Sequence, residues 1–310
     1  MRKETKGYSL VILGATFLGS IGIFGRLIYL HEPDPLTVVT FRALIAFALL
    51  FLATILLNPD SLRIRKRDFI YFAIYGLLSV TLCFLLFFYA IKFTTIATAT
   101  ILLYTYPAFI VILSAVFLKE KLTKTKLFAL LLTFLGCILV IQVYDPAELK
   151  LNLRGIIYGL GAGLGAGLYS IFGKKAVERY SPWTVVTYAL GFGSFFLLMI
   201  RGVTPLYSAS YPSITWIWIF ALAIVSTLLG YSIYTRGLKY IEAGRAGIVA
   251  TWEVVVASLL ALIIFCETLS ALQIFGALFI FLGIFIIKAH PQKRKSQSSL
   301  FKESSERLLG

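Results

Sequence analysis

The sequence predicts an all-α, polytopic membrane protein in which ten transmembrane helices form two inverted five-helix repeats. Of its 310 residues, 59% are hydrophobic and only 14% are charged, too apolar a balance for a single water-soluble core. The apolar residues gather in about ten stretches of roughly 20 residues, the length that crosses about 30 Å of hydrocarbon. The chain also aligns on itself when it is shifted by 147 residues.

The internal alignment defines the domain organisation. Residues 35–41 (PLTVVTF) lie over residues 182–188 (PWTVVTY), and residues 120–122 lie over residues 267–269. We therefore expect a first repeat at 1–146, a second at 147–288, and a polar, basic cytoplasmic tail at 289–310. Internal repeats in an apolar chain are typical of transporters.

Several of the expected helices have a recognisable limit or composition. The first follows a basic segment, Pro35 lies directly before the second, Pro182 begins the seventh, the sixth is rich in glycine, and Pro291 ends the tenth. Strands are disfavoured because the stretches are continuously apolar and do not alternate as barrel strands do. The expected spans are 7–29, 36–57, 69–91, 95–117, 126–143, 155–173, 182–201, 215–237, 246–265 and 271–288.

The basic residues set the orientation. Of the 29 lysines and arginines, 23 fall on one side of the ten spans, 5 fall on the other and Arg42 lies within the second span, a split that obeys the positive-inside rule. Both termini are then cytoplasmic in a multi-pass protein of the inner or plasma membrane. Because each repeat has five spans, the second enters from the opposite side and is inverted. The net charge of +15 thus records orientation, and nucleic-acid binding is not expected.

Glu253 is the most informative buried charge, about eight residues inside the ninth span and next to Trp252. A carboxylate at this depth is costly unless it is paired, protonated or facing water, so it is a candidate for binding a proton or a substrate amine. Its repeat mate is Tyr106, which breaks the symmetry. The alternative is a structural glutamate bonded to a neighbouring helix.

Arg42, about six residues inside the second span, is the other charged candidate, and its repeat mate is Ala189. It could bind a carboxylate or phosphate of the substrate. The favoured alternative is that it extends outward to the interface, as long basic side chains near helix ends do.

Aromatic residues of several spans could line an amphipathic pocket with Glu253, or could serve as interfacial or packing residues. Pro107 removes a backbone hydrogen bond and should loosen the fourth span at mid-depth. The candidate lining residues are Trp252, Tyr104, Tyr106, Tyr169 and Tyr231.

Glycines recur every fourth residue of the sixth span, at Gly155, Gly159, Gly163 and Gly167. Such a stripe lets a neighbouring backbone approach closely, either as a hinge contact between moving halves or as static packing. Glu120 and Glu267 end the fourth and ninth spans at opposite faces, and their symmetry favours a structural role at helix ends.

The sequence contains no motif typical of metal binding, cofactor binding or ATP hydrolysis. The three cysteines show no CxxC pairing, and no GxxxxGK[ST] loop is present, so neither a metal, a cofactor nor ATP hydrolysis is expected. An integral-membrane enzyme acting on lipid remains the alternative class. It would need a cluster of polar residues at one interface, yet His31 and His290 lie on opposite sides.

In these features the chain resembles the EamA-type carriers of the drug/metabolite transporter superfamily. The likeness lies in Pro35 before the span with Arg42, the span with Tyr104 and Pro107 that leads to 118–123 (LKEKLT), and its second copy at 265–270 (FCETLS). The resemblance implies a central cavity built by the first four helices of each repeat, with the fifth and tenth at the periphery.

From the resemblance we expect a secondary carrier, not an enzyme. It would export a small metabolite, amino acids being the leading class, by alternating access and coupling to protons, with membrane lipid around it. Sugars and nucleotide sugars are alternative substrates. Val254 and Leu18 stand where relatives carry Pro and Trp, so the substrate does not follow from the resemblance.

Overall fold

The computed structural model describes residues 2–31, 33–142, 152–207 and 209–290, and this part of the chain contains helices but no strand. Ten helical segments in it are long and apolar enough to cross a membrane, which confirms the predicted fold class. The end of the tail (residues 291–310) and the predicted boundary between the repeats (146/147) lie outside the described residues. The spans are Lys3–Tyr29, Pro35–Leu57, Asp68–Phe93, Ile96–Phe117, Lys124–Ile141, Leu153–Ala176, Pro182–Arg201, Ser213–Leu238, Ala243–Phe265 and Ala271–Ala289.

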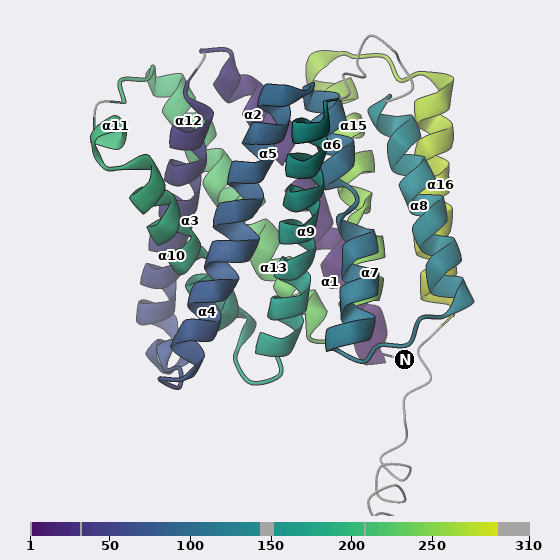
Figure 1. Cartoon of the computed structure of the whole chain (residues 1–310), viewed down its shortest axis with the longest axis horizontal. Helices are drawn as coiled ribbons and strands as arrows, with labels where there is room; N and C mark the ends of the chain where they lie inside the picture. Colours follow the sequence, from purple (N-terminus) through teal and green to yellow (C-terminus); the bar gives the residue numbers. More distant parts are fainter. Residues whose placement is uncertain (1, 32, 143–151, 208, 291–310) are drawn as a thin grey trace, which may run out of the picture.

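The first five spans contain several breaks (Figure 1). Span 1 divides at Ser20, span 3 contains a π-helical turn, and span 4 divides at residues 104–105. The elements are α1 (Arg2–Gly19), α2 (Ile21–Tyr29), α3 (Pro35–Leu57), η1 (Pro59–Leu62), α4 (Asp68–Gly76), η2 (Leu77–Thr81), α5 (Leu82–Phe93), α6 (Ile96–Leu103), α7 (Tyr106–Phe117) and α8 (Lys124–Ile141).

The second five spans cross the bundle in the opposite direction and repeat two of these breaks, whereas span 6, unlike span 1, is one continuous helix. Span 8 carries a π-helical segment where span 3 carries one, and span 9 divides where span 4 does. The elements are α9 (Leu153–Ala176), α10 (Pro182–Arg201), α11 (Thr204–Tyr207), α12 (Ser213–Ala221), η3 (Leu222–Leu229), α13 (Gly230–Leu238), α14 (Ala243–Ala250), α15 (Trp252–Phe265) and α16 (Ala271–Ala289).

Local sequence explains the helix starts. Asp34 caps α3, accepting from the Thr37 backbone N–H at 2.8 Å, and Ser181 caps the matching helix α10, accepting from the Thr184 N–H at 3.1 Å. In both, proline occupies the first turn, where the missing N–H costs nothing. The repeated cap and proline therefore fix the start of the second span in each repeat.

The fifth span of each repeat lies at the edge of the bundle, where α8 and α16 run side by side (Figure 1). A Cβ on Gly136 would lie 2.6 Å from the Gly276 carbonyl oxygen, so the two backbones touch. The main buried core lies among α1, α7, α9, α13 and α14. We call the face of the bundle where α1 begins the N-terminal face, and the other the opposite face.

Candidate functional site

The two repeats meet where their fourth helices are interrupted. Pro107 is the second residue of α7, where it has no N–H to continue the α6 ladder. Span 9 has Val254 at the matching position, yet it too divides, at Thr251, a break that no proline predicts. The hydroxyls of Thr105 and Thr251 each donate to the carbonyl three residues earlier, at 2.6 and 2.7 Å, and so compensate backbone groups freed by the breaks.

Glu253 lies directly after the break in span 9, in the first turn of α15. The Tyr106 hydroxyl donates to its Oε1 at 3.2 Å, and a Cβ on Gly19 of α1 would lie 2.7 Å from its carbonyl oxygen. Within the described residues no lysine or arginine forms an ion pair with it. The residue as a whole is only partly buried. Three helices therefore surround a carboxylate that has no cation among the described residues.

Two other predicted aromatics adjoin this carboxylate. The Tyr104 ring lies 5.9 Å from the Tyr106 ring, and its hydroxyl also faces Glu253. Trp252 turns toward α1, where its indole N–H donates to the Thr16 hydroxyl at 3.2 Å. Tyr104 and Tyr106 thus share one polar cluster with Glu253, whereas Trp252 joins the two repeats beside it.

The other two predicted tyrosines, Tyr169 on α9 and Tyr231 on α13, form a second group. Tyr169 is buried and shares a hydrogen bond of 3.0 Å with Thr235, so its hydroxyl already has a partner. Its ring lies 4.8 Å from that of Tyr231. Tyr231 is partly buried and lies within electrostatic range of both Glu253 and Arg42. Tyr231 therefore belongs to the surroundings of both charged candidates.

Arg42 lies seven residues into α3, about 10 Å along the helix axis from its start. The residue is 5% exposed, so it does not extend to the interface as the favoured alternative required. Its guanidinium carbon lies 4.6 Å from the centre of the Phe84 ring. Its Nε and Nη2 atoms are buried without a hydrogen-bond partner. Arg42 is therefore a buried cation without a counter-ion among the described residues.

The glycine stripe of α9 faces the broken helix of the first repeat. A Cβ on Gly159 would lie 2.6 Å from Leu102 Cβ, and one on Gly163 would lie 2.9 Å from the Leu102 carbonyl oxygen. The two ends of the stripe also face the first repeat, because a Cβ on Gly155 would contact Thr94 and a Cβ on Gly167 would contact Phe109. The stripe thus lets α9 of the second repeat touch the backbone at the α6–α7 break.

A buried ionic network links the repeats at the N-terminal face. Glu120, after α7, accepts the backbone N–H groups of Ala243 and Gly244 at 2.6 and 3.0 Å, and so caps α14 of the other repeat. The Lys126 side chain is 1% exposed and pairs with Glu120 at 3.2 Å and Glu242 at 2.9 Å. The short loop of one repeat is thereby fixed to a helix start of the other.

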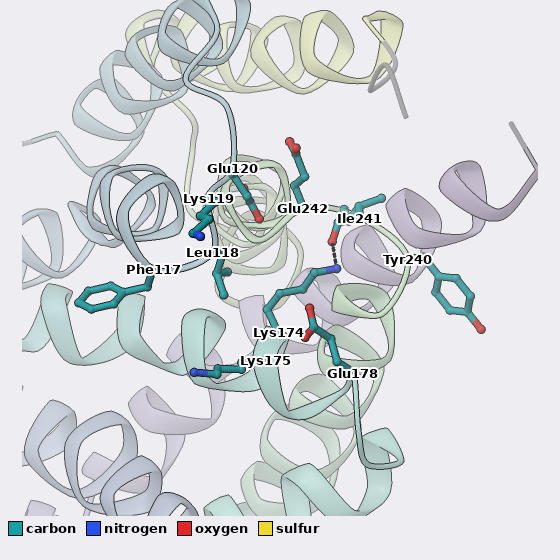
Figure 2. Close-up of a pocket in the computed structure, with 10 residues that line it drawn as sticks. All are labelled: Phe117, Leu118, Lys119, Glu120, Lys174, Lys175, Glu178, Tyr240, Ile241 and Glu242. Atoms are coloured by element: carbon teal, nitrogen blue, oxygen red, sulfur yellow. Dashed lines mark hydrogen bonds between the residues drawn. The ribbon is translucent and has the colours of Figure 1, made fainter. Parts of the chain in front are cut away.

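A pocket of about 410 Å³ opens beside this network, between the ends of α7, α9 and α13 (Figure 2). Lys174 reaches across it and donates to the carbonyls of Leu238 and Ile241 at 2.6 and 2.7 Å. All eight residues of α14 are buried between this pocket and the break beside Glu253. The lining residues are Phe117, Leu118, Lys119, Glu120, Lys174, Lys175, Glu178, Tyr240, Ile241 and Glu242.

Among the described residues of the opposite face, no corresponding link joins the repeats. Glu267, the repeat mate of Glu120, has a side chain 47% exposed and pairs with the exposed Arg26. The start of α6, which corresponds to the start of α14, is capped by Thr95 of its own repeat. A Cβ on Gly22 or Gly25 in α2 would meet nothing within 4 Å. The two faces therefore differ although the repeats match.

The ionic network itself was missed from the sequence. Lys126 and Arg245 are two of the 23 basic residues that the charge count assigns to the cytoplasmic side. Both are buried, and Arg245 donates to the Tyr8 hydroxyl and the Ile287 carbonyl, each at 2.9 Å. Each lies close in sequence to an acid, Glu120 or Glu242. That proximity of opposite charges was the available signal, and a count of positive residues alone ignores it.

Comparison with known proteins agrees with this architecture. The EamA-like transporter family matches residues 5–142 and again residues 153–289, once in each repeat. The chain belongs to the EamA-like transporter family. Because the family matches nearly the whole described chain, this EamA-like protein is a membrane transporter.

Individual relatives of this EamA-like protein support the same conclusion. An uncharacterized transporter of Archaeoglobus fulgidus is 30% identical over 282 residues, 90% of this chain and 95% of the relative. The riboflavin transporter ImpX of Fusobacterium nucleatum is 29% identical, over 63% of this chain and 72% of its own. One solved crystal structure shares the fold, with a TM-score of 0.78 at 15% identity over 91% of this chain and 96% of that one.

Proposed function

We propose that this EamA-like protein is a secondary active carrier that exports a small amine-bearing metabolite, amino acids being the leading class, in exchange for protons. The observation that carries the proposal is Glu253, a carboxylate without a cation at the break where the repeats meet. In a low-dielectric interior a carboxylate needs a proton, a cationic ligand or water. Glu253 can therefore take either a proton or a substrate ammonium group.

Competition between these two ligands supplies the coupling. A protonated Glu253 has lost the charge that attracts an ammonium group, so one carboxylate holds a proton or an amine but not both at once. The Tyr106 hydroxyl, 3.2 Å away, can donate to the carboxylate in either case. A carrier that crosses the membrane only with one ligand bound then exchanges protons moving inward for substrate moving outward.

The difference between the faces supports alternating access. The N-terminal face carries most of the basic residues, so we assign it to the cytoplasm. Here the Glu120 cap on α14 closes the route to Glu253. In the inward-open state we expect the inverted repeats to exchange roles, with Glu267 capping the start of α6 at Ile96 and Glu120 leaving α14.

The test is solute counterflow in proteoliposomes. Wild-type protein should exchange labelled for unlabelled amino acid, and an outwardly directed substrate gradient should drive proton uptake. Glu253→Gln should lower exchange at least tenfold and remove its pH dependence. The matched control is Glu178→Gln, an exposed carboxylate outside the Glu253 cluster, which should leave the pH dependence in place. A Glu253→Gln carrier with unchanged rate and pH dependence would refute the assignment.

A second solute class is favoured by one relative and by the aromatic side chains. A relative is named a riboflavin transporter, and the partly buried Tyr104 and Tyr231 rings could stack on a flat heterocycle. Riboflavin therefore belongs in the same counterflow panel, beside sugars and nucleotide sugars. Exchange of riboflavin without exchange of any amino acid would replace the leading class.

A further inference from the structure

Arg42 has a free hydrogen-bonding edge. Its two atoms without a partner are Nε and Nη2, both fully buried. In a guanidinium group these two nitrogens lie on the same side and donate in parallel, the arrangement that holds both oxygens of a carboxylate or phosphate. The unsatisfied atoms therefore match the shape of one oxyanion.

No internal counter-ion occupies this edge in the part of the chain that the structure describes. At the opposite face Asp34 is paired with Arg201 at 3.0 Å, and Glu267 is paired with Arg26. Glu253 accepts from Tyr106 instead. The near neighbours of Arg42 are the Phe84 ring, the Cys83 thiol and the hydroxyls of Tyr29 and Tyr231, none of them an anion at neutral pH.

A structural role does not explain such a cation. A buried guanidinium is costly unless an anion compensates it, and proteins usually give a buried charge a partner. The matching position of the second repeat is Ala189, which is fully buried and neutral, so the fold itself does not need a charge there. A binding role explains both the cost and the asymmetry, because one oriented ligand needs one anion site.

We propose that Arg42 binds the oxyanion group, a carboxylate or a phosphate, of the transported solute. This proposal rests on the carrier function above only in taking the oxyanion to be part of the solute. Tyr231 lies within electrostatic range of both Arg42 and Glu253. The solute then presents its anionic group to Arg42 on α3 and its amine to Glu253 on α15, which makes it zwitterionic.

Anion binding is tested on purified full-length protein by its thermal unfolding temperature. Sodium benzoate and sodium phosphate are compared with sodium chloride at matched ionic strength, for wild type, Arg42→Met and the control Arg26→Met. A ligand that binds only the folded protein raises this temperature. Benzoate or phosphate should do so in wild type and in Arg26→Met but not in Arg42→Met. The more effective probe identifies the class of oxyanion.

Equal increments in wild type and Arg42→Met, or no increment with either probe, would overturn the proposal. If Arg42→Met does not fold, Arg42→Lys keeps the charge but loses the paired donors, and the probe concentration giving half the increment should rise at least tenfold. An unchanged concentration would also overturn it. Should wild type bind the probes through Arg42 yet transport no solute, the anion site stands and the carrier proposal fails.

Discussion

The glycine stripe makes the sharpest prediction about packing between the repeats. In Gly163→Ala the new Cβ would lie 2.6 Å from the Thr105 hydroxyl oxygen and 2.9 and 3.1 Å from the carbonyl oxygens of Leu102 and Leu103. Relaxed contacts of carbon with other heavy atoms are roughly 3.5 Å, so the backbone at the α6–α7 break must move by about 0.5 Å or more. Because the Leu102 and Leu103 carbonyls belong to the backbone, a change of side-chain conformation alone cannot remove the overlap with the new Cβ.

The expected cost follows from two opposing effects. Overpacking of this kind costs about 1–3 kcal/mol, whereas replacing glycine by alanine inside a helix gains about 1 kcal/mol. The control Gly22→Ala has nothing within 4 Å of the new Cβ and should show the gain alone. Gly163→Ala should therefore be less stable than Gly22→Ala by about 1–3 kcal/mol.

Unfolding followed by the fluorescence of the four tryptophans measures the difference. The unfolding temperature of Gly163→Ala should fall several degrees below that of Gly22→Ala. Adding Thr105→Ala removes the nearest contact but leaves both carbonyls, so it should restore only part of the loss. If Gly163→Ala proves as stable as Gly22→Ala, α9 does not press on the break and the packing argument is wrong.

Three further substitutions test other parts of the structure. Lys126→Met should lower the free energy of unfolding by about 3–5 kcal/mol, measured by thermal unfolding, because two buried carboxylates lose their shared cation. Adding Glu120→Gln should recover part of this loss. A Lys126→Met protein as stable as wild type would contradict the network. Arg42→Met should raise the unfolding temperature without added oxyanion, since it removes an uncompensated buried charge, and a fall would indicate an unseen structural partner. Ser181→Ala should cost about 1 kcal/mol through loss of the α10 cap, and no loss would show that this cap is dispensable.

The sequence predicts the helical framework because each signal is local. Twenty apolar residues need no long-range information to span a bilayer, and the caps at Asp34 and Ser181 act within one turn. The 147-residue internal shift adds the relation between the repeats. The number and order of the spans therefore follow from the chain alone.

Features that depend on contacts between the repeats were not predictable in the same way. The break at Thr251 has no proline, and it lies against the first repeat, where a Cβ on Gly19 would be 2.7 Å from the Glu253 carbonyl oxygen. Lys126 is indistinguishable from a loop lysine until Glu120 and Glu242 surround it. Likewise, only the packing of α3 shows that Arg42 stays inside the bundle.

The polar interior itself is tested most directly by thiol labelling of Tyr104→Cys, combined with Cys266→Ser to remove the exposed native thiol. A membrane-impermeant reagent should label residue 104 from the opposite face and not from the N-terminal face, where Glu120 and α14 close the route. A transported solute should slow that labelling. Labelling from neither face, or only by a lipid-soluble reagent, would contradict a solute site between the inverted repeats.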